Sequence, residues 1–82
     1  MNKTKLLKKL LSGSKNIHFS DLTHCLKAFG FILARVNGSH HIYAHKDIPE
    51  LINIQNVHGK AKPYQVKQFI NLIERYNVHM EE

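Results

Sequence analysis

The spacing of hydrophobic positions changes along the chain from a helical repeat to a strand repeat and back, which predicts the order of elements. Residues 3–11 predict a short amphipathic helix, because leucines recur on one side and lysines surround the rest. Residues 21–29 predict a second helix, with Ser20 as its N-cap and Gly30 as the stop after it. Its core-facing stripe has the i, i+3, i+4, i+7 spacing and consists of Leu22, Cys25, Leu26 and Phe29.

A β-hairpin is predicted next. Residues 31–36 and 39–45 are rich in apolar, β-prone types and read as its two strands. Asn37-Gly38 lies between them, and both residues tolerate the positive φ that a type I′ turn requires. The pair His40-His41 therefore stands at the start of the second strand, on backbone fixed by a tight turn.

A third strand and a last helix complete the pattern. Apolar and amide side chains alternate over residues 51–57, which predicts a half-buried strand. We expect residues 46–50 to form the loop before it, with Pro49 blocking sheet pairing there. The last helix begins at Pro63, because the missing N–H of proline suits the first helical position. Its buried stripe is predicted to be Val66, Phe69, Ile70 and Ile73, closed by Tyr76.

The predicted order of helix, helix, three strands and helix favours an α+β fold. We expect a three-stranded antiparallel sheet with helices packed on one face. The 82 residues suffice for one small domain. We divide the chain into an N-terminal amphipathic basic helix and joint over residues 1–16 and an α-β-β-β-α domain over residues 17–82. The leucines of the first helix are expected to dock on the core of the domain rather than on a membrane.

The charge of the chain points toward an acidic partner. Twelve Lys and Arg against six Asp and Glu give a net charge of +6, which favours nucleic acid. Cys25 is the single cysteine and indicates a buried thiol in a reducing compartment. No apolar run approaches the roughly 20 residues of a membrane span, and Lys8 and Lys9 fall where a secretion signal would be apolar. We therefore expect a cytoplasmic protein without a membrane partner.

Seven histidines raise the question of a metal site, and their spacing argues against one. His40 and His41 are adjacent on a predicted strand, so they point to opposite faces. His41 and His45 share a face but lie about 13 Å apart at the strand rise, too far for one ion with bonds near about 2 Å. We predict no metal and no cofactor. The histidines interpreted as polar surface residues are His18, His24, His45 and His79.

The remaining histidines, His40, His41 and His58, are candidates for catalysis or for phosphate binding. Imidazole has an ordinary pKa of about 6.5, so it takes up and releases protons near neutral pH. Turn geometry fixes the pair His40-His41, although periodicity leaves open which of the two faces the helices. His58 sits in a predicted turn with Gly59, close to Lys60 and Lys62, and a turn with lysines and free N–H groups suits phosphate.

Several motifs follow one another in a recognisable order: Gly30-Phe31, Arg35, Gly38-Ser39-His40-His41-Ile42-Tyr43, Val57-His58-Gly59 and a terminal helix. From Ser20 to Tyr76 the chain thereby resembles the HicA toxin family. These are small mRNA interferases of bacterial toxin–antitoxin pairs, with a fold like that of a double-stranded RNA-binding domain. Two features depart from the family pattern. The segment 60–64 replaces a Gly-Thr pair found in many members, and the N-terminal helix is longer.

The resemblance implies a toxin that cleaves mRNA as a metal-independent endoribonuclease and is neutralised by a HicB-like antitoxin in a hetero-oligomer. The catalytic histidine of the family directly follows Gly-Ser or Gly-Gly, which falls on His40, so His41 is expected to assist RNA binding. The residues expected to contact RNA or its phosphates are Arg35, Ser39, His41, His58, Lys60 and Lys62.

Such a ribonuclease can use the 2′-hydroxyl of RNA as its nucleophile, which would spare DNA. A histidine removes the hydroxyl proton, and positive side chains stabilise the charge that develops on phosphorus. A second proton-transfer group is required, and Tyr43, His58 or a lysine could serve. The alternative is a non-catalytic RNA-binding module with the same fold, and a further one is an interaction domain that uses the leucine helix.

Overall fold

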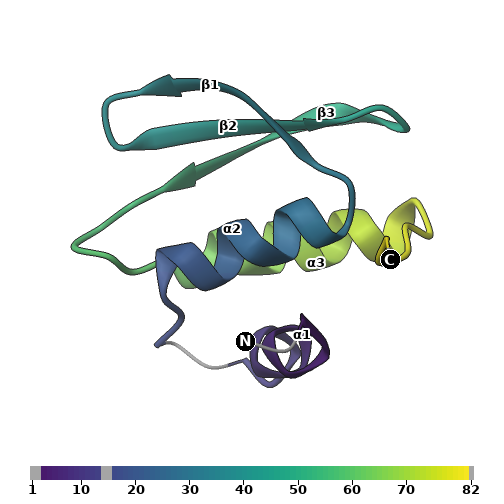
Figure 1. Ribbon diagram of the computed structural model, residues 1–82, viewed down its shortest axis with the longest axis horizontal. Helices are drawn as coiled ribbons and strands as arrows, with labels where there is room; N and C mark the ends of the chain where they lie inside the picture. The colour runs from purple at the N-terminus through teal and green to yellow at the C-terminus, as the bar shows by residue number, and fades with distance from the viewer. Residues whose placement is uncertain (1–2, 14–15, 82) are drawn as a thin grey trace.

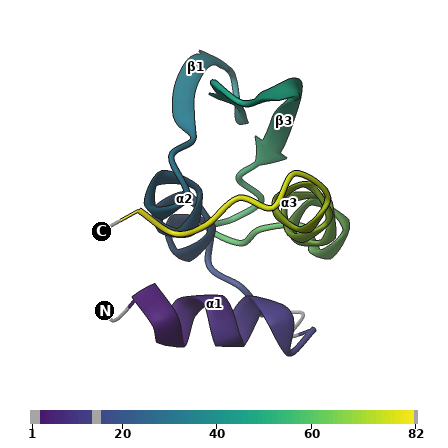
Figure 2. The same cartoon turned by 90° about the vertical axis from the view of Figure 1, so that its right-hand side faces the viewer.

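A computed structural model describes residues 3–13 and 16–81 of the chain. Its elements are, in order, α1 (Lys3–Leu11), α2 (Phe19–Ala28), β1 (Ile32–Asn37), β2 (His40–His45), β3 (Ile48–Gln55) and α3 (Pro63–Arg75). The strands form one antiparallel sheet in the order β1-β2-β3. Helices α2 and α3 lie side by side under one face of the sheet, and α1 lies beneath them as a third layer (Figures 1 and 2). The predicted α+β class is confirmed.

Helix α2 begins two residues earlier than predicted, at Phe19. The N-cap is His18, whose backbone is extended and whose side chain makes no capping hydrogen bond, so the prediction of Ser20 was wrong. The entry to the helix is instead fixed by backbone pairing, because the Phe19 N–H donates to the Gly59 carbonyl at 2.9 Å. Ser20 lies inside the first turn, where its carbonyl accepts a hydrogen bond from the Thr23 hydroxyl at 2.9 Å.

The predicted stop after α2 is confirmed at Gly30. Its φ is +88°, in the left-handed region that glycine adopts without strain. The Phe31 N–H donates to the Leu26 carbonyl at 3.0 Å and the Gly30 N–H to the Lys27 carbonyl at 3.0 Å. This pair of bonds is a Schellman motif, which satisfies carbonyls that the end of a helix leaves unpaired.

The chain turns back on itself after α3, which begins at Pro63 as predicted. Asn77 has a φ of +52°, and the Val78 N–H donates to the Ile73 carbonyl at 2.9 Å, so α3 also ends in a Schellman motif. The Glu81 N–H then donates to the Ala28 carbonyl at 2.6 Å. The segment after α3 therefore lies against the end of α2.

The loop expected over residues 46–50 is much shorter in the structure. Only Lys46 and Asp47 separate β2 from β3, so the predicted bounds of the loop were wrong. Pairing is nevertheless interrupted at Pro49, which has no partner between the pairs His45–Ile48 and Tyr43–Ile52. Proline fits here because β3 is an edge strand and its register with β2 shifts by a bulge at this point. The turn is held by the Asp47 N–H, which donates to Nδ1 of His45 at 3.0 Å.

The core lies between the sheet and the helix pair. Its most deeply buried side chains are Leu22, Leu26, Ile52, Ile54 and Phe69. Helix α1 joins this core through Leu10, which is 2% exposed, and an ion pair of 4.0 Å links Lys9 to Asp21 of α2. The predicted docking of the first helix is thereby confirmed for Leu10, whereas Leu11 is exposed. The side chain of Leu6 and residues 14–15 of the joint lie outside the described residues.

Strand β1 differs from its neighbours because all six of its residues are exposed. The exposed fraction is 72% for Ile32 and 53% for Val36. It forms the edge of the sheet opposite β3 and pairs only with β2 among the described strands. Phe31, which was expected to start this strand, is buried and lies just before it.

Candidate functional site: the open face of the sheet around His40

The histidine pair follows the turn between β1 and β2. Asn37 is the last residue of β1 and pairs with His40, which leaves Gly38 and Ser39 as the two loop residues. Gly38 has a φ of +63°, and neither Asn37 nor Ser39 has a positive φ. A glycine with positive φ at the first loop position alone is the pattern of a type II′ turn. The predicted hairpin is confirmed, but its turn is centred on Gly-Ser and not on Asn-Gly.

Strand register assigns the two histidines to opposite faces of the sheet, as predicted. Tyr43 and His45 are buried and face the helices, and His41 shares their side because side chains alternate along a strand. His40 therefore projects from the other face. Figure 1 shows α2 and α3 together on the helix side, so no described helix covers the face that carries His40. Periodicity alone could not make this assignment.

His40 is half-buried and makes one side-chain hydrogen bond. Its Nδ1 lies 3.1 Å from Oδ1 of Asn53 on β3. His40 pairs with Gln55, and Ile42 pairs with Asn53, so the two bonded side chains are diagonal neighbours on the same face. The other ring nitrogen, Nε2, has no hydrogen-bond partner among the described residues.

A bulge in β1 brings a positive charge to the same face. Leu33 pairs with Tyr43 and Arg35 pairs with Ile42, so the register shifts at the residue between them. Without the shift, Arg35 would share the helix-facing side of Leu33. With it, Arg35 lies on the open face as a diagonal neighbour of His40, a relation that separates Cα atoms by about 7–8 Å.

His41 is fixed in a different environment. Its ring packs edge-on against Phe19 at the start of α2, with 4.8 Å between ring centroids and 62° between planes. Its Nδ1 lies 3.3 Å from the Ser39 carbonyl oxygen. This side chain links the sheet to the helix layer on the face opposite His40. The two imidazoles therefore do not share a site.

The predicted basic turn is a type I′ turn. His58 and Gly59 have φ of +51° and +81°, and Val57 and Lys60 exchange two backbone hydrogen bonds of 3.0 and 2.9 Å. Oδ1 of Asn56 accepts the Gly59 N–H at 2.7 Å. The Gly59 N–H, one of the groups expected to be free for phosphate, is therefore used within the turn.

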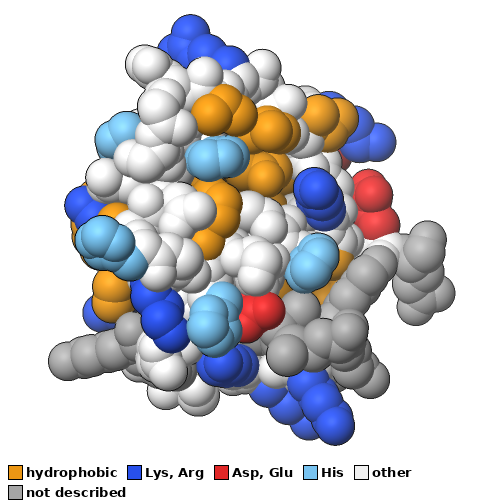
Figure 3. Space-filling view, turned by 60° about the vertical axis from the view of Figure 1, so that its left-hand side comes forward, with side chains coloured by type: hydrophobic (Ala, Val, Ile, Leu, Met, Phe, Trp, Pro, Cys, Tyr) orange, Lys and Arg blue, Asp and Glu red, His pale blue; other side chains and the backbone are white. Residues whose placement is uncertain are grey.

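The lysines of this segment belong to the helix side of the molecule. The Lys60 ammonium donates to Oδ1 of Asn16 at 2.6 Å, and that of Lys62 lies 5.9 Å from the centroid of the Tyr64 ring. The turn is connected to the hairpin because the Asn56 N–H donates to the Ser39 carbonyl at 3.0 Å. Figure 3, with the left side of Figure 1 brought forward, shows histidines and basic side chains spread over the surface, not gathered in one patch.

Two amide side chains matter here that sequence reasoning missed. Asn53 was read only as a polar position of an alternating strand. Gln65 is almost fully buried in α3, and its Oε1 accepts the Gln55 N–H at 2.8 Å, which fixes the end of β3 next to His40. A polar residue within the apolar stripe of a helix was the available signal for Gln65.

Comparison with protein families adds an independent finding. A family model described as HicA toxin of bacterial toxin-antitoxin matches residues 19–74. This chain belongs to the HicA toxin family. The match runs from the start of α2 to the last turn of α3, so it includes the whole sheet and excludes α1. No curated protein and no solved structure matches the chain.

One catalytic candidate from the sequence, and one histidine interpreted as a surface residue, lie on the helix side of this HicA-family domain. Tyr43 is buried on the helix side, and burial raises the pKa of its phenol, which makes it a poor partner for proton transfer at the open face. His45 was interpreted as a surface residue and is buried. It faces the helices in alternation with Tyr43 and packs 5.0 Å from the Phe31 ring. His18, His24 and His79 are exposed as predicted.

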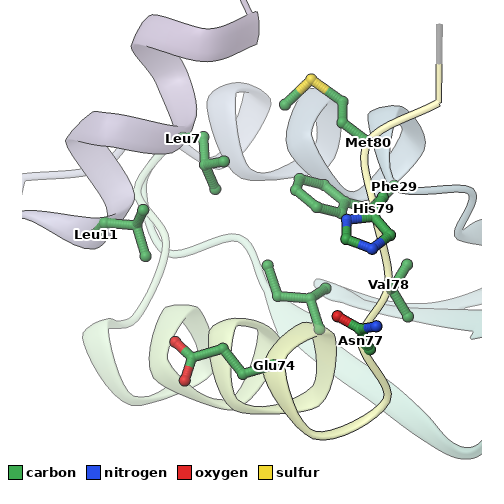
Figure 4. Close-up of a pocket in the computed structure, with 9 residues that line it drawn as sticks. Leu7, Leu11, Phe29, Glu74, Asn77, Val78, His79 and Met80 are labelled. Carbon is green, nitrogen blue, oxygen red and sulfur yellow. The ribbon is translucent and has the colours of Figure 1, made fainter.

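An apolar hollow of this HicA-family chain is remote from the histidine pair. It measures about 380 Å³ and lies between α1 and the segment after α3 (Figure 4). Its apolar lining includes Leu7, Leu11, Phe29, Val78 and Met80. Within the described ranges, no group of three or more His, Cys, Asp or Glu side chains is placed to hold a metal ion. None of the described helices is long and apolar enough to cross a bilayer.

Proposed function

We propose that this HicA-family chain is an endoribonuclease toxin that cleaves mRNA without a metal, with His40 as the proton-transfer residue. The observation that carries the proposal is the accessible imidazole on the open face of the sheet. Its Nδ1 is held by Asn53, its Nε2 is unoccupied by any described side chain, and the cation of Arg35 lies on the same face. An accessible base next to a positive charge is what cleavage of a sugar–phosphate requires.

The reaction uses the nucleophile that RNA itself carries. Nε2 of His40 takes the proton of the 2′-hydroxyl as the 2′-oxygen forms a bond to phosphorus. The bond from phosphorus to the 5′-oxygen breaks, and that oxygen accepts a proton from a second group. His58 or a lysine of the adjacent turn remains a candidate for this acid. General acid–base catalysis of this kind contributes about 10²- to 10⁴-fold to the rate.

Positive side chains stabilise the charge that accumulates on the phosphate oxygens. Arg35 is best supported for this role, because the bulge in β1 puts it on the face of His40. Lys60 and Lys62 lie on the helix side, in the segment connected to the hairpin, so they would contact RNA beyond the cleaved bond and not at it. Ser39 and His58 would contribute polar contacts along the same path. The role of His41 in RNA binding is least supported, because it packs on Phe19.

A toxin of this family needs a partner that restrains it. A HicB-like antitoxin with an acidic surface is the complement of a chain with a net charge of +6. Coverage of the open face by that partner would block access of RNA to His40. A stable hetero-oligomer follows from this arrangement, because the toxin is harmless only while it is covered.

The decisive experiment compares purified His40→Ala with His24→Ala, a matched control that removes an exposed imidazole from α2. Messenger RNA is incubated with each protein in buffer that contains EDTA, and the fragments are quantified. We expect cleavage by the parent and by His24→Ala, and at least a 100-fold loss in His40→Ala. Cleavage by His40→Ala at the parental rate would refute the role of His40. Binding of RNA by the parent without cleavage would select the non-catalytic RNA-binding alternative.

A further inference from the structure

We infer that Asn53 is a positioning residue for His40, which it holds in the tautomer with the proton on Nδ1 and the lone pair on Nε2. The inference rests on the proposed function of His40 for its catalytic meaning. The geometric part stands on its own, because it concerns one hydrogen bond between two strands, 3.1 Å from Nδ1 of His40 to Oδ1 of Asn53.

The position of Asn53 is unusual for its residue type. Asparagine is depleted in strands, because its side chain competes for backbone hydrogen bonds and packs poorly on a pleated surface. Its neighbours Ile52 and Ile54 are fully buried on the helix side, so residue 53 is held on the open face by their packing. Strand register then makes it a diagonal neighbour of His40.

The chemistry of an amide oxygen decides the tautomer. This oxygen only accepts hydrogen bonds, so Nδ1 of His40 must carry the proton when the two atoms are bonded. The lone pair is then on Nε2, the nitrogen that has no described partner. Because Nδ1 stays protonated in both the neutral and the charged imidazole, the bond persists as Nε2 takes up and releases a proton. The ring keeps one orientation through a catalytic cycle.

Few charged side chains lie near His40 on the open face. The neighbouring strand β1 contributes Arg35 and the neutral Asn37, and β3 contributes the neutral Asn53 and Gln55. Arg35 is therefore the one charged side chain that the described strands bring to the open face next to His40.

The first test measures the tautomer and requires no activity. Long-range ¹H–¹⁵N NMR spectra of the labelled protein distinguish the two ring nitrogens of neutral His40. We expect the Nδ1–H form in the parent and in Asn71→Ala, which removes an exposed asparagine from α3. In Asn53→Ala the Nε2–H form should increase, because that form is preferred by free histidine. An Nε2–H tautomer in the parent would overturn the inference, since the amide would then be donating to Nδ1.

The second test measures kinetics. Asn53→Ala should lower kcat about 10-fold or more with little change in KM, because orientation of the base is lost and RNA contacts are kept. Asn53→Asp should restore much of kcat and move the acidic limb of the pH–rate profile to higher pH, because a carboxylate stabilises the imidazolium. Unchanged kcat and an unmoved profile in both variants would overturn the inference.

The two proposals fail separately. Retained cleavage by His40→Ala removes the catalytic meaning of the site while the NMR tautomer still reports on the bond to Asn53. Loss of cleavage in His40→Ala, together with parental tautomer and kinetics in Asn53→Ala, removes the positioning role alone.

Discussion

The end of α2 offers a sharp test of the fold, through the substitution Gly30→Ala. Gly30 has a φ of +88°, and a left-handed conformation costs an L-residue about 1–2 kcal/mol. Alanine also lowers the entropy of the unfolded chain, which offsets about 0.4–1 kcal/mol. The backbone term alone therefore predicts a loss of about 1 kcal/mol in the free energy of unfolding.

Steric contacts of the added Cβ increase the expected loss in the free energy of unfolding of Gly30→Ala. A Cβ on residue 30 would lie 2.8 Å from Oε2 of Glu81 and 3.1 Å from Nε2 of His45. The Glu81 carboxylate ends a flexible, exposed side chain and can move aside. The His45 ring is buried against Phe31 and anchored at Nδ1, so it yields less readily. Overpacking of this kind costs about 1–3 kcal/mol, which brings the expected total to about 2–4 kcal/mol.

The matched control is Gly59→Ala. Gly59 has a φ of +81°, and a Cβ there meets nothing within 4 Å, so this variant measures the backbone term without the contacts. Urea unfolding followed by circular dichroism gives both free energies, and thermal unfolding gives shifts of about 4–8 °C per kcal/mol. Equal losses in the two variants would refute the close contact at His45. No loss in Gly30→Ala would refute the left-handed cap itself.

Other predictions concern the buried amide, the thiol and the basic turn. Gln65→Ala leaves the Gln55 N–H without its acceptor and should cost about 1–3 kcal/mol in urea unfolding; parental stability would contradict the bond. Burial, with a smaller effect of a nearby carboxylate, raises the pKa of Cys25 to about 11, so at pH 8 it should react with a disulfide reagent only on unfolding. Rapid reaction of the folded protein would show an accessible thiol. The double variant of Lys60 and Lys62 to alanine should reduce the salt dependence of RNA binding by about 0.7 for each lost phosphate contact, and an unchanged slope would remove these lysines from the interface.

Local chemistry predicted the helices and the class of fold well. The stop at Gly30 and the start at Pro63 depend on φ preferences of single residues, which require no long-range contact. The cap at Ser20 failed because backbone pairing between residues 18–19 and the turn at 57–60 competes with a side-chain cap. A contact between segments so distant in sequence leaves no local signal.

The site was harder to predict than the fold, because it depends on strand register. The pattern located His40 and His41 but could not say which one faces the helices. The bulge in β1 that turns Arg35 to the open face, and the diagonal relation of Asn53 to His40, both follow from pairing between strands. Pro49 was assigned to a loop for the same reason, whereas it lies in an edge strand at a bulge, where the missing N–H of proline costs little.

The exposed edge strand β1 affects how the protein behaves in solution. An exposed edge strand with unpaired backbone groups can pair with the same strand of another copy, and repulsion between chains of charge +6 opposes this pairing. Added salt screens this repulsion beyond about 10 Å at 0.1 M, whereas the ability of the edge strand β1 to pair with another copy is unchanged. Isolated protein should therefore stay monomeric in dilute buffer and self-associate as ionic strength rises, the reverse of the salt dependence expected for the RNA binding proposed above.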